Sequence, residues 1–257
     1  MKKIALIIIS VLALSGCGLI SKINWDTAQL QQATQMALSA VTITDAQVIA
    51  LSQQTVQQLD AQNTIDNGTY AKRLNNLLAS VKDIDGVPVN YKVYKLDEVN
   101  AFACGDGSIR VYSGLMDIMN DDELMAIIGH ECGHVSHQDT KHAMKNAYLA
   151  AAARGVIASA GGTTIATLSK GVLGDLGESY ISSQYSQKQE FAADEYGFQF
   201  AVEHGHTPYS MATALEKLVK LSTGSQASKV QKMFSSHPDS ETRAARMREK
   251  ADKYSKK

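Results

Sequence analysis

The feature that most constrains this chain is a pair of histidines one turn apart in a stretch predicted to be a long helix. The stretch begins at Glu123, after the capping and acidic residues Asn120-Asp121-Asp122, and is expected to continue to about Tyr148. It contains His130-Glu131-Cys132-Gly133-His134. Residues four apart share a helix face, so both imidazoles can reach one ion. The surrounding residues predict burial and a close approach to another element: Leu124, Ile127, Ile128, Gly129 and Gly133.

Two histidines around a glutamate are typical of a zinc site in a hydrolase. Imidazoles suit Zn²⁺, and a site with three protein ligands leaves its fourth position to water. The ion lowers the pKa of that water and polarises a carbonyl, while Glu131, projecting at a neighbouring angle, is placed to take the proton. The five-residue pattern also occurs on solvated helix faces, so a third ligand is needed to support a metal site.

The third ligand must come from another part of the chain. The longer metzincin pattern is excluded, because the chain has His137 and Thr140 where that pattern needs glycine and histidine. The alternative is a glutamate on a later helix, and Glu190-Phe191-Ala192-Ala193-Asp194 supplies one. In this interpretation Glu190 binds the metal, and Asp194 accepts a hydrogen bond from the second nitrogen of a ligating histidine. Taken alone, such a pair of acids is usually solvated charge.

The first 16 residues have the pattern of an export signal. Met1-Lys2-Lys3 is a basic start, and the apolar run from Ile4 to Leu14 is too short to cross a bilayer comfortably. Leu14-Ser15-Gly16-Cys17 resembles the bacterial lipobox, which implies cleavage before Cys17 and lipidation of that cysteine. Gly18 stands where an inner-membrane retention signal would be Asp, so the resemblance favours the outer membrane. A plain signal peptide that happens to contain a cysteine is the alternative.

The remaining chain is predicted to be a mostly helical α+β protein. Its 257 residues, 20% charged and 44% hydrophobic, are typical of a globular protein, and a net charge of -1 argues against nucleic-acid binding. We expect residues 17–66 to form a lipid-anchored helical segment and residues 67–257 a catalytic domain. Three strands are expected to form a small antiparallel sheet: 87–94, 99–103 and 108–112. Further helices are expected over 26–62 as a pair, then 70–81, 186–203, 210–221 and 239–253.

Three separated motifs together resemble the HtpX-type and CAAX prenyl protease-type zinc metallopeptidases. They are the histidine motif at 130–134, the acidic motif at 190–194, and Ser236-His237-Pro238 followed by Arg243. More narrowly, residues 99–103, residues 111–116 and the lipobox resemble the small bacterial outer-membrane lipoproteins of this family. The resemblance implies a zincin (gluzincin-like) catalytic domain that binds one Zn²⁺ per chain through His130, His134 and Glu190.

The resemblance also implies roles for residues around the metal. Glu131 matches the general base, and Asp194 matches an aspartate that orients a ligating histidine. His237 matches a histidine thought to steady the oxyanion, with Arg243 lending it charge or bracing the site. Four further residues match the family's edge strand, along which a peptide substrate lies extended: Asn100, Ala101, Phe102 and Ala103.

The implied activity is cleavage of misfolded or misassembled cell-envelope proteins by a domain that faces the periplasm. An envelope chaperone or scaffold with a gated or vestigial metal site is the alternative from a different class. A hydrolase acting on peptidoglycan peptides is a nearer alternative. The oligomeric state is not indicated by the sequence.

Two features leave alternatives open. Cys104, at the end of the expected substrate strand, and Cys132, inside the metal motif, either form a disulfide or stay free, and Cys104 as a free thiol would be able to reach the zinc. We favour Cys132 as a small buried residue. Residues 147–168 are apolar and rich in small residues but include Arg154, so we expect a mobile helix or lid there rather than a membrane span. We expect residues 147–185 as a whole to gate the site.

Overall fold

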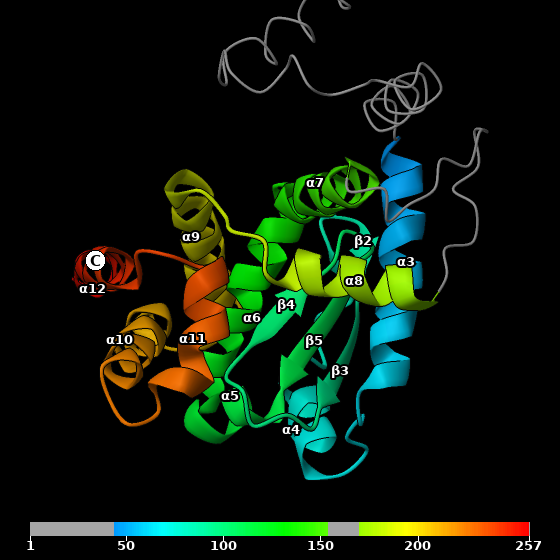
Figure 1. Cartoon of the computed structure of the whole chain (residues 1–257). Coiled ribbons are helices and arrows are strands. Elements are labelled where there is room, and N and C mark those ends of the chain that lie inside the picture. The colour runs from blue at the N-terminus through cyan, green and yellow to red at the C-terminus, as the bar shows by residue number, and fades with distance from the viewer. Residues whose placement is uncertain (1–43, 154–169, 257) are drawn as a thin grey trace, which may run out of the picture.

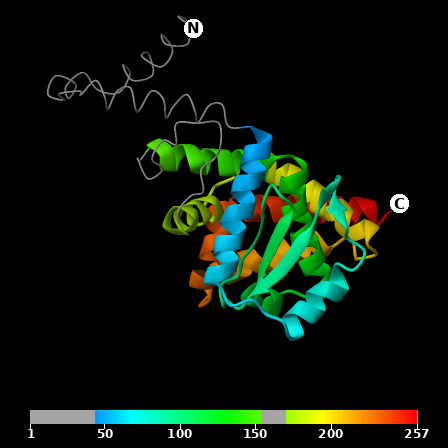
Figure 2. The same ribbon diagram turned by 90° about the vertical axis from the view of Figure 1, so that its right-hand side faces the viewer.

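A small mixed sheet with helices around it makes up the part of the chain that this computed structural model describes, residues 44–153 and 170–256 (Figures 1 and 2). The first helices and strands are α3 (Asp45–Gln62), α4 (Thr69–Leu77), β1 (Asp83–Ile84), β2 (Val87–Pro88), β3 (Asn90–Tyr94), β4 (Ala101–Ala103) and β5 (Ser108–Tyr112). The later helices are α5 (Ser113–Ile118), α6 (Asp121–Ser136), α7 (Asp139–Ala153), α8 (Lys170–Ile181), α9 (Gln187–Glu203), α10 (Ser210–Ser222), α11 (Ala227–Ser236) and α12 (Ser240–Tyr254).

The mostly helical α+β class is confirmed, and several expectations fall beyond the described residues. Outside the described residues lie the signal segment, Cys17 and the first of the two helices expected over 26–62. Residues 154–169 of the expected gating segment also lie outside them. Among the described helices, none combines the length and the hydropathy that a membrane span needs. Three helices, α5, α8 and α11, were not expected from the sequence.

The three-stranded sheet is mixed, although an antiparallel sheet was expected. Its strand order is β3-β5-β4, with β4 antiparallel and β3 parallel to β5. The turn of residues 104–107 folds β4 back against β5 as a hairpin. The chain reverses twice between β3 and β5, so these two strands run in the same direction, and β3 pairs with β5 instead of with β4. A separate antiparallel pair is formed by β1 and β2. This order leaves β4 as an edge strand beside α6.

Helix α6, which carries the two histidines, crosses α9 so closely that the two backbones nearly touch. A Cβ on Gly133 would lie 3.0 Å from the Cα of Ala193, and one on Gly129 would lie 3.0 Å from the Cα of Gly197. Gly197 itself leaves space for the carbonyl oxygen of Ala126, which would be 2.7 Å from an added Cβ. Glycine permits this approach because it has no Cβ. The crossing brings the first turn of α9 over the histidines of α6.

One helix was expected over 123–148, and this expectation is wrong. The start is as predicted, since the Asn120 side chain accepts from the Glu123 backbone N–H and the Glu123 side chain accepts from the Asn120 backbone N–H. The helix, however, ends at Ser136, and Gln138 adopts a left-handed φ of 63° before α7 begins at Asp139. No glycine or proline marks this break. The turn carries Asp139 back toward α6, where its side chain is buried.

The helix α3 lies in the segment expected to carry the lipid anchor, and it packs closely on the body. Its Asp60 accepts hydrogen bonds from Arg110 of the central strand, from Nε at 2.8 Å and from Nη2 at 3.0 Å. The Arg110 side chain is 2% exposed and that of Asp60 is 14% exposed. Burial raises the pKa of Asp60, but hydrogen bonds from Arg110 and Lys92 outweigh it, so the pKa is lowered. Residues of α3 also pack against α7 and α8.

We expect Asp60→Asn to lower the free energy of unfolding by about 3 kcal/mol, because it leaves the buried Arg110 without a counter-charge. Lys92→Met is the matched control: Lys92 also pairs with Asp60 but is 42% exposed, so its loss should cost less than about 1 kcal/mol. Urea unfolding followed by circular dichroism measures both. Because the pKa of Asp60 is lowered by folding, its contribution is present above its unfolded pKa and is lost as pH falls through the folded value. Equal effects of the two substitutions would contradict this account.

Candidate metal centre

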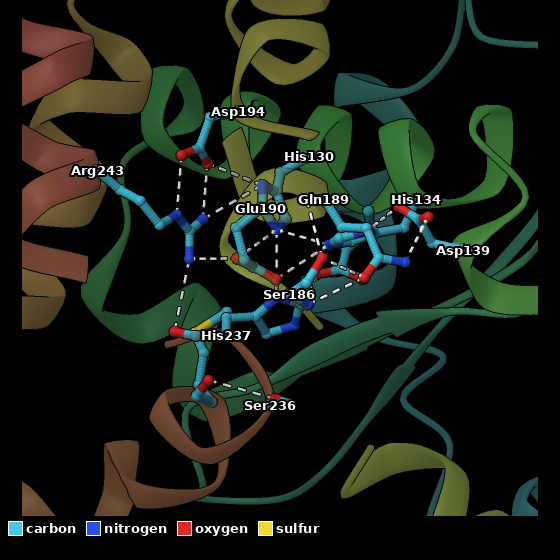
Figure 3. A network of polar contacts seen from close by, with 12 residues as sticks. His130, His134, Asp139, Ser186, Gln189, Glu190, Asp194, Ser236, His237 and Arg243 are labelled. Carbon is cyan, nitrogen blue, oxygen red and sulfur yellow. Dashed lines mark hydrogen bonds and ion pairs between the residues drawn. The ribbon is translucent and has the colours of Figure 1, made fainter. Parts of the chain in front are cut away.

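Four buried side chains bring their donor atoms together between α6, α9 and the end of α11 (Figure 3). They are His130 and His134 of α6, Glu190 of α9 and His237, which follows α11. One donor atom from each lies within 4.8 Å of all the others. Nε2 of His130 is 3.1 Å from Nε2 of His134 and 3.2 Å from Nδ1 of His237. Oε1 of Glu190 is 3.0 Å from Nδ1 of His237 and 3.4 Å from Nε2 of His134.

The donor set fits a metal ion of tetrahedral preference. Bonds of about 2.0–2.1 Å to a tetrahedral zinc separate neighbouring ligand atoms by about 3.3–3.4 Å, close to the spacings observed here. Nδ1 of each α6 histidine faces a carboxylate, which can only accept, so a neutral ring keeps its proton on Nδ1 and directs the lone pair of Nε2 toward the other donors. Two such lone pairs 3.1 Å apart repel each other unless a proton or a metal ion lies between them. The spacing and chemistry therefore match a metal site.

Asp194 and Arg243 hold His130 and Glu190 from behind. Nδ1 of His130 donates to Asp194 at 2.9 Å, and Arg243 donates to the same carboxylate through Nε at 2.8 Å and Nη2 at 2.6 Å. Arg243 also forms an ion pair with Glu190. Burial raises the pKa of Asp194, but the hydrogen bonds and charge of Arg243 outweigh it and lower the pKa to about 2. Of the two roles expected for Arg243, the geometry supports bracing.

Asp139, which the sequence did not reveal, orients His134 in the way that Asp194 orients His130. Nδ1 of His134 is 3.0 Å from Oδ2 of Asp139, whose other oxygen accepts from Nε2 of Gln189 at 2.7 Å. On an uninterrupted helix, position 139 would lie about 140° around the axis from His134. Only the break at Gln138 brings the carboxylate back to the imidazole. The sequence signal would have been an acid just beyond the motif at a helix end.

Glu131 lies beside the donor set but outside it. Its side chain is 2% exposed, and its Oε1 has no hydrogen-bond partner among the described residues. Nε2 of His237 lies 3.6 Å from that oxygen. A buried carboxylate oxygen without a partner is unfavourable unless something else approaches it. The arrangement leaves Glu131 free to accept a proton from a molecule at the metal site.

Tyr185, also not singled out by the sequence, covers one ligand. Its ring stacks on that of His134 with centroids 3.9 Å apart and planes at 14°. Its backbone N–H donates to the carbonyl oxygen of Ser236 at 3.2 Å, which fixes the chain next to His237. The residues just before α9 therefore lie across the metal site.

Cys104 and Cys132, the cysteines within the described residues, are free and fully buried. The interpretation of Cys132 as a small buried residue agrees with this, and the alternative disulfide with Cys104 is not formed. Cys104 does not belong to the cluster of donor atoms found in the described chain. Burial raises the pKa of both thiols well above the ordinary range, so neither is a ready metal ligand or nucleophile.

The expected substrate strand is where the resemblance placed it, at the edge of the sheet. Its four residues, however, are all buried: Asn100 is 1%, Ala101 1%, Phe102 5% and Ala103 1% exposed. Some other part of the chain therefore covers this edge.

Two histidines and a glutamate on crossing helices, with a buried glutamate next to the first histidine, define a zincin-type metallohydrolase site. The chain belongs to peptidase family M48, a family of metalloproteases, whose model matches residues 67–251. The metalloprotease LoiP of Escherichia coli (strain K12) is 44% identical over 240 residues, which cover 92% of this chain and 91% of LoiP. The metalloprotease YcaL of the same strain is 37% identical over 217 residues, 83% of this chain and 84% of YcaL. The beta-barrel assembly-enhancing protease of Escherichia coli (strain K12) is 29% identical over 191 residues, which cover 71% of this chain but 38% of that protein.

We expect Asp139→Asn to weaken metal binding about 10- to 100-fold, because an amide supports the basicity of His134 less than a carboxylate does. Competition with a chromogenic chelator measures the affinity. Asp252→Asn, on the outer part of α12, is the matched control and should leave it unchanged. An unaltered affinity in Asp139→Asn would show that Asp139 does not tune the ligand.

Proposed function

We propose that this protein is a zinc-dependent endopeptidase that hydrolyses peptide bonds with Glu131 as the general base. The observation that carries the proposal is the Oε1 of Glu131, which is buried next to the four-donor cluster and has no hydrogen-bond partner in the described part of the chain. A purely structural metal site has no use for such a carboxylate, and with only His130, His134 and Glu190 as ligands a fourth position would be left for water beside Glu131. Membership of a metalloprotease family supports the same conclusion.

Zinc, when bound by His130, His134 and Glu190, supplies Lewis acidity that activates water and polarises a carbonyl. Glu131 takes a proton from the attacking water and returns it to the leaving amine. His237, whose ring borders both Glu131 and the donors, is proposed to steady the oxyanion. Asp194, Asp139 and Arg243 keep the ligands in place and do not take part in bond making.

The proposed substrates are misfolded or misassembled envelope proteins, bound as an added strand along Asn100 to Ala103. The similarity to a protease named for beta-barrel assembly supports this substrate class. Cys17 is proposed to carry the lipids that tether the protein to the bacterial outer membrane, with the catalytic domain facing the periplasm.

We expect Glu131→Gln to reduce kcat by at least about 10²- to 10⁴-fold, because the amide cannot accept the proton. Metal content, measured by elemental analysis, should stay at one ion per chain, because the donor atoms are unchanged. Glu195→Gln, on the outer face of α9, is the control variant. Gln189→Glu is unsuitable for this purpose, because Gln189 donates a hydrogen bond to Asp139. Full activity in Glu131→Gln would disprove the mechanism.

A chelator distinguishes this function from that of an envelope chaperone with a vestigial site. We expect unfolded casein to be cleaved by the wild-type protein, cleavage to stop with a chelator, and activity to return on adding Zn²⁺. A chaperone would suppress aggregation of the same client equally with and without the chelator. Cell-wall fragments in parallel reactions test the peptidoglycan alternative.

We expect Cys17→Ala to move the protein from the membrane fraction to the soluble fraction and to abolish labelling by radioactive palmitate. Cys104→Ala is the matched control and should remain in the membrane fraction, because Cys104 is buried in the body. Retention of Cys17→Ala in the membrane would refute lipidation at this residue.

A further inference from the structure

The register of the sheet shows which backbone groups of the edge strand face away from it. Cys104 donates to Ser108 of β5 and Asn100 accepts from Tyr112 of β5, so residues 100 and 104 bond inward. Inward and outward groups alternate along an antiparallel strand. The register pairs Phe102 with Arg110, so Phe102 also bonds inward, and Ala101 and Ala103 direct their N–H and C=O groups to the free edge. A peptide added to the sheet must pair with these groups.

One of these outward groups already has a partner within the chain. The hydroxyl of Tyr180, in the last turn of α8, donates to the carbonyl oxygen of Ala103. The Tyr180 ring also meets the Phe102 ring nearly edge-on, with centroids 6.4 Å apart. Both side chains are buried, at 3% and 5% exposed. Tyr180 thus makes the hydrogen bond that the N–H of an added strand would make.

The same stretch of chain also covers the metal site. Five residues beyond Tyr180, Tyr185 stacks on His134 and is tied to Ser236. Figure 1 shows α8 running across the ends of β4 and β5 toward α3. On that side Gly177 lies so close to Leu59 that an added Cβ would be 3.0 Å from the leucine side chain. The contact with α3, which does not involve the site, therefore holds α8 three residues before Tyr180.

We propose that Tyr180 is an internal competitor for the substrate: its hydroxyl occupies the Ala103 carbonyl and must leave before a peptide can add to β4. This inference rests on the proposed endopeptidase function and names a residue that controls access to its substrate strand. When Tyr180 leaves, the N–H of an extended peptide replaces its hydroxyl on Ala103. The free enzyme keeps the carbonyl satisfied without substrate, and each binding event exchanges one hydrogen bond for another.

Tyr180→Phe removes the hydroxyl and keeps the ring against Phe102. In the free variant the Ala103 carbonyl is buried without a partner, whereas in the complex the peptide satisfies it. Substrate binding should therefore strengthen by about two- to tenfold, the range expected for one net hydrogen bond. The KM for an extended peptide should fall by that factor while kcat stays the same, because the hydroxyl touches no reacting group.

Tyr148→Phe is the matched control, since Tyr148 packs against the same apolar cluster and its hydroxyl forms no hydrogen bond with β4 among the described residues. Its KM should equal that of the wild-type protein. An equal or higher KM in Tyr180→Phe would overturn the proposal. If the wild-type protein shows no chelator-sensitive cleavage at all, the proposed function fails instead, so the two failures are distinguishable.

A second measurement does not depend on turnover or on the folding of Tyr180→Phe. In the Glu131→Gln protein, a fluorescent extended peptide is bound without being cleaved, and tyrosines are nitrated with and without it. Nitration mapped by mass spectrometry should rise at Tyr180 when the peptide is bound, because the displaced hydroxyl becomes accessible. Unchanged or reduced nitration of Tyr180 in the complex would contradict the competition.

Discussion

The close crossing of α6 and α9 is the constraint on which the rest of the structure depends. The metal ligands come from two segments about 60 residues apart, and a carboxylate reaches two imidazoles only if the helix backbones nearly touch. Gly129, Gly133 and Gly197 make this possible, since any side chain there would meet backbone or ring atoms within about 3 Å. Once the helices cross in this way, Glu190 and Asp194 face His130 from one side of α9.

The charges buried at the crossing explain why the site needs a cation. Four carboxylates surround the imidazoles, those of Glu131, Asp139, Glu190 and Asp194, and all are at least nine-tenths buried. Arg243 is the buried guanidinium that pairs with two of them. Buried charge of one sign is unfavourable without compensation, so a divalent ion at the donor cluster balances most of the remaining negative charge. Metal binding and stability of this region are therefore coupled.

The sequence predicted the parts of the site that depend on local spacing. His130 and His134 share a face because of the helical period, and Glu190 and Asp194 lie one turn apart on a helix for the same reason. The missed parts depend on tertiary contacts. Asp139 reaches His134 only because Gln138 adopts a left-handed conformation, which no glycine in the sequence indicates. The sheet contains a parallel pair because β3 pairs with β5 and not with β4, the next strand along the chain. Tyr180 and Tyr185 belong to a stretch whose composition indicated mobility and whose contacts are with distant residues.

The covered edge strand has a consequence for which polypeptides the proposed enzyme would accept. A chain that adds to β4 must offer backbone groups that have no partners of their own, and a folded protein offers few of these. It must also replace the Tyr180 hydroxyl on Ala103, so a weakly bound or briefly exposed segment competes poorly. Both requirements act through the backbone and not through particular side chains. Selection by backbone availability suits an enzyme whose proposed substrates share the loss of their native pairing and not a common sequence.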